Sequence, residues 1–332
     1  MALLTRDDRL TRPPAQRRRW LQNRLVTVAF WIALVGLSIA IVGFLLTLAT
    51  NRFDFSEPKL RESLKFTDTQ LDVAFFGDSL TLEGVNPDII DQTLRTRSYN
   101  FALGGASILE SEMQLSYFLR HNPKPRLVAL GIYLNIPNKP AGARPTLYFE
   151  LPNDLKARYR NELLTHEGIK IDHSFIVFNH VPAYRYRNTI DLVIKSLLSR
   201  DDQRPSFVKG QARVAFFREP YLGREHESVF RADELESFIR FCHEQQIPLV
   251  LFEPPNHPGY SELTSNRTKV LDDVSRLVAK YPATRFLSYN GPSFSPSKKD
   301  WVNLNHLNTG GSIKFSKRLS NMVAEEIPAN TR

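Results

Sequence analysis

The sequence predicts an α/β fold in which helices cover both faces of a parallel sheet. Short, almost continuous apolar runs alternate along the chain with segments whose apolar residues recur at helical spacing. Strands buried on both faces of a parallel sheet have this continuous apolar character, and the crossovers between them are usually helices. One long uncharged segment precedes this pattern, so we also expect a single transmembrane helix near the N-terminus.

The expected domain begins at residue 71, after a polar juxtamembrane linker that we place at residues 51–70. Its apolar runs predict strands over Leu71–Phe76, Ser98–Leu103, Arg126–Ile132, Pro248–Phe252 and Arg285–Tyr289. Amphipathic spacing predicts helices over Gly105–Arg120, Asp233–Gln246, residues 261–280 and Gly310–Glu326. Residues 136–230 break the alternation with prolines, aromatics and arginines, so we expect an insertion there within a domain that spans residues 71–330.

The segment Leu25–Thr50 contains no charged residue and is long enough to cross a membrane. A helix needs about 20 apolar residues to span a bilayer core, and this segment has 26 residues. Arg17–Arg19 and Arg24 precede it together with Trp20, which is the arrangement that the positive-inside rule expects of a cytoplasmic N-terminus.

We therefore expect a cytoplasmic basic tail over residues 1–24, a transmembrane helix over residues 25–50 and an extracytoplasmic remainder. The alternative is a cleaved signal peptide, whose apolar region is normally about 7–15 residues long and ends at a small-residue cleavage site. The segment here is longer, and Thr47-Leu48-Ala49 is a poor cleavage site.

The net charge of +9 is concentrated in two parts of the chain. Residues 1–24 carry seven Arg and two Asp, which gives +5, and residues 136–230 carry fifteen Lys and Arg against eleven Asp and Glu, which gives +4. The remainder sums to zero, so we expect no broad basic face and no nucleic-acid partner. Cys242 is the single cysteine. It lies on an apolar helix face, so we expect a buried structural thiol.

The stretch VAFFGDSL places Ser79 directly after the first expected strand. Ligands of open parallel sheets bind at the carboxyl ends of the strands, so a nucleophile at this position would face a substrate. A serine needs a base, an oriented proton path and oxyanion donors to act at neutral pH. A plain serine in a tight turn is the alternative interpretation.

His306 is the candidate base. It lies in the loop WVNLNHLNTGG, just before the last expected helix, from which it can point into a cleft beside an earlier strand end. His166, His173 and His180 are spaced by seven residues, which matches no common metal-ligand spacing. The sequence also contains no glycine-rich phosphate loop, so we expect neither a metal site nor a cofactor.

The GDSL motif after the first strand and the late histidine together resemble the SGNH (GDSL) hydrolase superfamily, over roughly residues 71–135 and 248–326. This resemblance implies a flavodoxin-like three-layer fold with a parallel sheet. It also implies that Ser79 is the nucleophile and that the Ser79 N–H belongs to the oxyanion hole. Gly105, within YNFALGGA, is the implied second donor.

Two motifs depart from the pattern of that family. The third block normally reads Gly-x-Asn-Asp, and this chain has GIYLN, so Tyr133, Asn135 or neither supplies the third oxyanion donor. The last block normally reads Asp-x-x-His, and this chain has NLNH, which puts Asn303 at the position of the acid. Asp300, six residues before His306, can replace the acid only if the loop folds back.

A single N-terminal anchor before such a domain resembles bacterial envelope proteins, namely those of alginate O-acetylation and of teichoic acid D-alanylation. The resemblance implies an acyltransferase or esterase that acts through acyl-Ser79 on a cell-envelope polysaccharide or polymer. A multi-span membrane O-acyltransferase is the implied protein partner, and the basic tail is compatible with binding of membrane lipid. Inner-membrane anchoring, with the domain in the periplasm or at the cell surface, is the implied location.

Two alternatives to this function stay open. The first is an SGNH fold that has lost catalysis and serves as a glycan-binding or scaffold subunit of an acylation or export complex. The second is a membrane-tethered esterase for small or lipid esters.

Four further residues are candidates for contact with the substrate. Asp78 and Glu253 each follow an expected strand, although a structural turn also explains Glu253. Tyr184 and Tyr186 lie in the stretch YRYR, where aromatic rings can stack on sugars and arginines can meet anionic groups. An exposed loop is the alternative for that stretch.

Overall fold

A computed structural model of the chain describes residues 14–53, 56–134, 152–159, 181, 225–256, 263–288, 298–303 and 305–328. Its centre is a parallel sheet of five strands in the order β2-β1-β3-β4-β5. The strands are β1 (Val73–Phe76), β2 (Ser98–Asn100), β3 (Leu127–Gly131), β4 (Leu249–Phe252) and β5 (Thr284–Leu287). This strand order is that of flavodoxin-like folds, and the order reverses between β1 and β3. The predicted fold class is confirmed.

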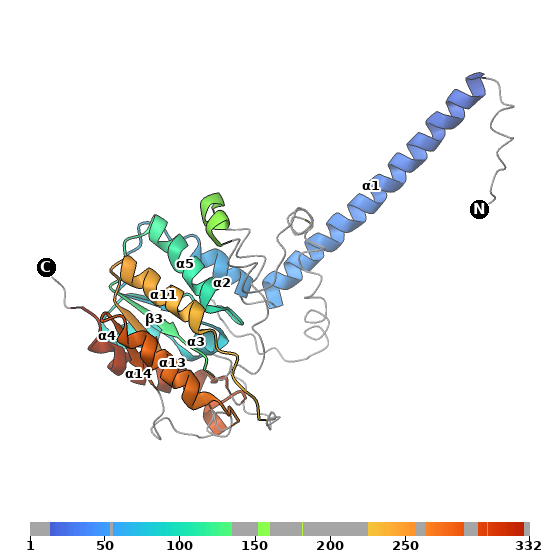
Figure 1. Ribbon diagram of the computed structural model, residues 1–332. Helices are drawn as coiled ribbons and strands as arrows, with labels where there is room; N and C mark the ends of the chain where they lie inside the picture. The colour runs from blue at the N-terminus through green and yellow to red at the C-terminus, as the bar shows by residue number, and fades with distance from the viewer. Residues whose placement is uncertain are drawn as a thin grey trace.

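Helices cover both faces of the sheet (Figure 1). Alternate residues of each strand point to opposite faces, so Ala74 and Phe76 belong to one core while Val73 and Phe75 belong to the other. The first core is closed by α5 (Ile108–His121), α11 (Ala232–Glu244) and α13 (Arg267–Ala279). The second is closed by α4 (Pro87–Leu94) and α14 (Thr309–Ala324). Cys242 is fully buried in the first core, and burial raises the pKa of its thiol well above the ordinary value.

Strand β2 is shorter than expected, because it ends at Asn100 rather than at Leu103. The Asn100 side chain donates to the Val85 carbonyl at 2.9 Å and to the Thr81 carbonyl at 3.0 Å. Its amide oxygen accepts the Ala102 N–H at 3.0 Å. These bonds join the end of β2 to residues 81–85, and the Phe101 and Leu103 N–H groups still donate to the Phe75 and Gly77 carbonyls, so the chain stays beside β1 up to the glycines of the second block.

The helix α1 extends over Pro14–Phe53 and projects away from the α/β domain (Figure 1). Its apolar span, Gln22–Leu48, has 27 residues with a mean hydropathy of 2.6. The hydroxyls of Thr27, Ser38 and Thr47 each donate to the carbonyl four residues earlier, so these polar groups need no water. The helix is long and apolar enough to cross a membrane as an anchor. A signal sequence can have the same length and composition.

The expected linker contains a second helix, α2 (Ser56–Ser63), which the polar composition of residues 51–70 did not reveal. The expected insertion is described only in part. Its helical turn at residues 153–159 packs onto the domain through the buried Glu112 of α5. Glu112 accepts from Tyr159 Oη at 3.1 Å, from Arg158 Nη2 at 3.1 Å and from Ser237 Oγ of α11 at 2.9 Å. The remaining limits of the insertion stay a prediction.

Candidate active site

Ser79 is placed by a sharp turn from β1 into the short helix α3 (Ser79–Gly84). Gly77 makes this turn with φ +141°, a conformation that side chains rarely adopt. A Cβ at Gly77 would lie 2.4 Å from Thr81 Oγ1 and 2.8 Å from the Gly131 carbonyl oxygen, so the turn requires glycine. Asp78 caps α3 by accepting the Leu80 N–H at 2.9 Å. Ser79 is therefore fixed as the first residue of the helix.

His306 reaches this serine from the loop before α14. Its Nε2 lies 2.9 Å from Ser79 Oγ, and its Nδ1 lies 3.1 Å from Asn303 Oδ1. Serine, imidazole and amide thus form one line, in which the amide holds the position that an acid holds in a serine triad.

The side-chain oxygen of Asn303 is held in place by two backbone donors. Oδ1 accepts the His306 N–H at 2.8 Å and the Asn305 N–H at 3.1 Å. Only the oxygen of an amide can accept these bonds, so the same oxygen also faces Nδ1 and must accept its proton. The tautomer that follows from this network carries its proton on Nδ1 and leaves the Nε2 lone pair toward Ser79.

Asp300 does not take the acid position, although the loop does fold back. Val302 N–H donates to the His306 carbonyl at 2.8 Å, and Asn308 N–H donates to the Asp300 carbonyl at 3.0 Å. The Asp300 carboxylate instead accepts both of its bonds from Lys314 Nζ, at 2.7 Å and 2.8 Å. It holds the loop against α14, and Asn303 is the residue that orients the imidazole.

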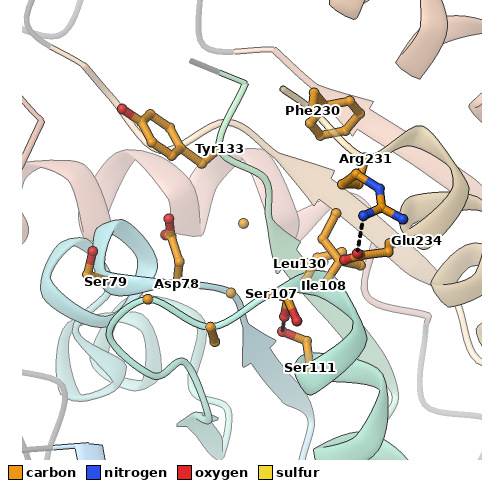
Figure 2. A pocket seen from close by; sticks show the side chains of 14 residues that line it. Asp78, Ser79, Ser107, Ile108, Ser111, Leu130, Tyr133, Phe230, Arg231 and Glu234 are labelled. Carbon is orange, nitrogen blue, oxygen red and sulfur yellow. Dashed lines mark hydrogen bonds and ion pairs between the residues drawn. The ribbon is translucent and has the colours of Figure 1, made fainter. Parts of the chain in front are cut away.

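A cavity of about 240 Å³ opens beside Ser79 at the carboxyl ends of β1 and β3, where the strand order reverses (Figure 2). Open sheets of this kind bind their ligands at such a switch point. Near Ser79 the cavity is bordered by Gly77, Asp78 and Gly105, and Gly105 has φ +69°. Ser79 opens α3, and the first N–H groups of a helix have no intrahelical acceptor. Ser79 and Gly105 thus border the same space, and their role as oxyanion donors stays a prediction.

Tyr133 lines the same cavity, and Figure 2 shows its ring above Asp78 and Ser79. Its hydroxyl oxygen lies 3.5 Å from Asn305 Nδ2, beside His306. Tyr133 thus lies between the cavity and the His306 loop, and its role as an oxyanion donor stays a prediction. Asn135, the other candidate for the third oxyanion donor, lies outside the described residues.

Glu253 does not line the cavity. Its two carboxylate oxygens each lie 2.8 Å from Arg267 Nη2, and its side chain is almost fully buried. This ion pair joins the end of β4 to the start of α13, so Glu253 has the structural role that its turn-like sequence also allowed. Tyr184 and Tyr186 lie outside the described residues.

The far part of the cavity contains residues that the sequence analysis did not single out. Phe230, Arg231 and Glu234 lie at the start of α11, and Arg231 and Glu234 form an ion pair (Figure 2). The only signal for them is a polar first turn directly after an aromatic residue, which many helices share. Among the described residues, no group of three or more His, Cys, Asp and Glu could hold a metal ion.

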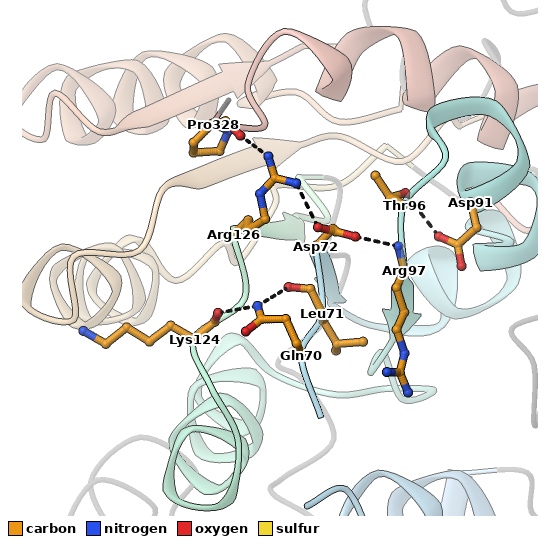
Figure 3. Close-up of polar contacts among 9 residues, drawn as sticks. All are labelled: Gln70, Leu71, Asp72, Asp91, Thr96, Arg97, Lys124, Arg126 and Pro328. Carbon is orange, nitrogen blue, oxygen red and sulfur yellow. Dashed lines mark hydrogen bonds and ion pairs between the residues drawn. The ribbon is translucent and has the colours of Figure 1, made fainter. Parts of the chain in front are cut away.

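Polar contacts hold the amino ends of the central strands, at the end of the sheet opposite the cavity (Figure 3). Asp72, before β1, accepts the Arg97 N–H at 2.8 Å and Arg126 Nη1 at 2.9 Å. Arg126 also donates to the Pro328 carbonyl, which joins the start of β3 to the chain after α14. These contacts fix the amino ends of the central strands and so keep their carboxyl ends, which carry the site, in register.

Asp78 provides a test of the electrostatics of the site. Burial raises its pKa from the ordinary 3.8 to about 6, against the lowering effect of the N–H bonds that it accepts. Because the folded state binds this proton more tightly, the resulting stability is present below about pH 4 and is lost as the pH rises through 6. Asp78→Asn keeps the helix cap and removes this cost, so we expect it to be about 1–3 kcal/mol more stable than the wild type at pH 8.

The measurement is urea unfolding at pH 4 and pH 8, where the gain should be present only at the higher pH. Asp272→Asn, at an exposed position on α13, is the control and should show no such difference. Equal stability of wild type and Asp78→Asn at pH 8 would mean that the charged form of the half-buried carboxylate is not disfavoured.

Comparisons with known proteins find similarity at the level of the fold. No family model and no curated protein sequence matches the chain. A GDSL-like lipase from Bacteroides thetaiotaomicron is similar at 12% identity with a TM-score of 0.37, covering 82% of this chain and 98% of that one. A family two carbohydrate esterase from Clostridium thermocellum, solved with cellohexaose, is similar at 11% identity with a TM-score of 0.33, covering 78% and 65%. Likenesses of this size concern the fold, so the function is argued below from the contacts of the site.

Proposed function

We propose that this chain is a membrane-anchored serine esterase or acyltransferase that acts, through an acyl-Ser79 intermediate, on acyl groups of a cell-envelope polysaccharide or polymer. The observation that carries the catalytic part is the line from Asn303 Oδ1 to His306 to Ser79 Oγ, with distances of 3.1 Å and 2.9 Å. A nucleophile beside a base, which is itself oriented by a third group, is the arrangement that activates a serine.

The chemistry follows from this line. His306 Nε2 takes the proton of Ser79 Oγ while Oγ forms a bond to the ester carbonyl carbon, and the carbonyl π electrons move onto the oxygen. The Ser79 and Gly105 N–H groups stabilise this oxyanion. When the carbonyl re-forms, the bond to the leaving alcohol breaks, and the alcohol oxygen takes the proton from Nε2. A second hydroxyl, from water or from an acceptor, repeats these steps on acyl-Ser79 and returns the proton to Oγ.

Water and a carbohydrate hydroxyl compete for acyl-Ser79, and this competition decides between hydrolysis and transfer. Asn303 accepts the Nδ1 proton but carries no charge, so it stabilises the imidazolium less than a carboxylate would. The same base activates either hydroxyl, so transfer is favoured where a bound carbohydrate holds its hydroxyl at acyl-Ser79 more closely than water is held. The proposed partner that supplies the acyl group is a multi-span membrane O-acyltransferase.

A serine-directed fluorophosphonate probe tests the catalytic part. We expect the full-length protein to be labelled and the label to disappear in Ser79→Ala and in His306→Ala. Labelling that persists in Ser79→Ala would place the reactive group elsewhere.

A second candidate function is a non-catalytic glycan-binding or scaffold subunit. The neutral Asn303 in the place of the acid is the observation that favours it. A complete lack of labelling in a well-folded wild type, together with measurable binding of an envelope glycan, would decide for this second candidate.

The proposed topology has the basic tail in the cytoplasm and the α/β domain outside, because the arginines precede the apolar span of α1. Protease added to intact spheroplasts is therefore expected to digest the domain while a cytoplasmic marker survives. Mass spectrometry of the purified protein should find residues 25–50 still attached. Protection of the domain would contradict the topology and the envelope substrate, whereas loss of residues 25–50 would identify a signal peptide.

A further inference from the structure

We infer that the cavity beside Ser79 receives the acyl group of the substrate, and that the Arg231–Glu234 ion pair sets the longest acyl chain that it admits. This inference rests on the proposed function and specifies its substrate as an ester with an acyl chain longer than acetyl.

The position of His306 decides which part of an ester enters the cavity. Nε2 must donate its proton to the leaving oxygen, so the alcohol part lies on the side of His306. Of the described residues, His306 and Asn303 are not among those that line the cavity. The loop that carries them belongs to the face covered by α14, whereas the cavity crosses the end of the sheet toward α5 and α11 on the other face. The acyl part of the ester is the part that points this way.

The middle of the cavity is apolar. Ile108, Leu130 and Phe230 line it, and all three belong to or pack against the core beneath α5 and α11. Each methylene that leaves water for such a surface favours binding about fourfold. Because this contact becomes close only when the carbonyl carbon sits at Ser79 Oγ, the rate of acylation should increase with chain length.

The end of the cavity is charged. Glu234 is 5% exposed, and its Oε1 lies 3.7 Å from Arg231 Nη1. Arg231 is held at the same time by Asp233, through Nε at 3.0 Å and Nη2 at 2.8 Å. Figure 2 shows this pair at the side of the cavity away from Ser79, next to Ile108 and Leu130. A methylene pushed against it would remove water from the Arg231 guanidinium, whose side chain is 30% exposed, without replacing a hydrogen bond, which is unfavourable.

The volume of the cavity indicates the size of chain that fits before this limit. It is about 240 Å³, and one water molecule occupies about 30 Å³ in the liquid, close to the volume of a methylene. An unbranched chain of about four to eight carbon atoms fills such a space.

The test is the rate of hydrolysis of p-nitrophenyl esters, from acetate to dodecanoate, by the full-length protein in detergent. For the wild type we expect a maximum between about four and eight carbon atoms. In Arg231→Leu/Glu234→Leu, which removes one charge of each sign, the maximum should move to longer chains and the rate on dodecanoate should increase about tenfold or more, the gain of two methylenes. Ile108→Phe narrows the cavity between Ser79 and the ion pair and should move the maximum to shorter chains.

Arg240→Leu/Glu244→Leu is the matched control, because it removes an exposed ion pair of 4.0 Å from the same helix. It should leave the profile unchanged. A wild-type maximum at acetate, or profiles that coincide in wild type and both cavity variants, overturns the inference while fluorophosphonate labelling of Ser79 still supports the proposed function. The absence of any hydrolysis or labelling that depends on Ser79 overturns both.

Discussion

Ser79→Ala is expected to lower ester turnover by about 10⁴- to 10⁶-fold without changing the thermal unfolding of the protein. The only described contact of the Ser79 hydroxyl is its 2.9 Å bond to His306 Nε2. The cap and the turn that build α3 depend on Asp78 and Gly77 instead. Removal of this hydroxyl therefore removes the bond-forming atom and leaves the surrounding structure intact.

The control for Ser79→Ala is the loss of another hydroxyl that contributes equally little to the free energy of unfolding. Ser275→Ala, on the exposed surface of α13, removes an oxygen that bonds only to the Leu271 carbonyl in the same helix. Its turnover should equal that of the wild type, and both variants should unfold within about 2 °C of it. Turnover retained in a well-folded Ser79→Ala would leave the scaffold function as the better account.

The sequence was most informative where burial dictates composition. The runs from Val73 to Phe76 and from Leu249 to Phe252 are apolar at every position because both faces of their strands are covered, and the structure has strands there. It was least informative for α3 and α4. With six and eight residues they are too short to show a helical period, and α3 begins inside the GDSL motif, where no helix was expected.

The sequence predicted that Ser79, Gly105 and His306 lie close together, because each follows a strand or precedes a helix whose end lies at the carboxyl end of the sheet. Two features could not be predicted in this way. The direction of the Asn303 amide depends on two backbone N–H groups of its own loop. The Arg231–Glu234 pair depends on how α11 packs beside α5, which no local pattern encodes.

Asn303→Asp is expected to raise the rate of ester hydrolysis by about 10- to 100-fold. A carboxylate near an imidazolium favours the charged form by about one to two pKa units, and each unit corresponds to a factor of ten. In a serine protease the reverse change, from acid to amide, lowers kcat by about 10⁴-fold, in part because the amide stabilises the wrong tautomer. That part is absent here, since the His306 and Asn305 N–H groups already turn Oδ1 toward Nδ1. The expected gain is therefore the electrostatic part alone.

The His306 and Asn305 N–H groups should donate to the new carboxylate without rearrangement, because both oxygens of a carboxylate are acceptors. The assay is hydrolysis of p-nitrophenyl acetate and butyrate by the wild type, Asn303→Asp and Asn303→Asp/Ser79→Ala. Asn321→Asp serves as the control, because it adds the same charge at an exposed position on α14. An increase in Asn303→Asp alone would show that the amide limits the reaction with water. An increase that survives Ser79→Ala would mean that another group attacks the ester. An unchanged rate would mean that the charge of the third residue does not limit this site.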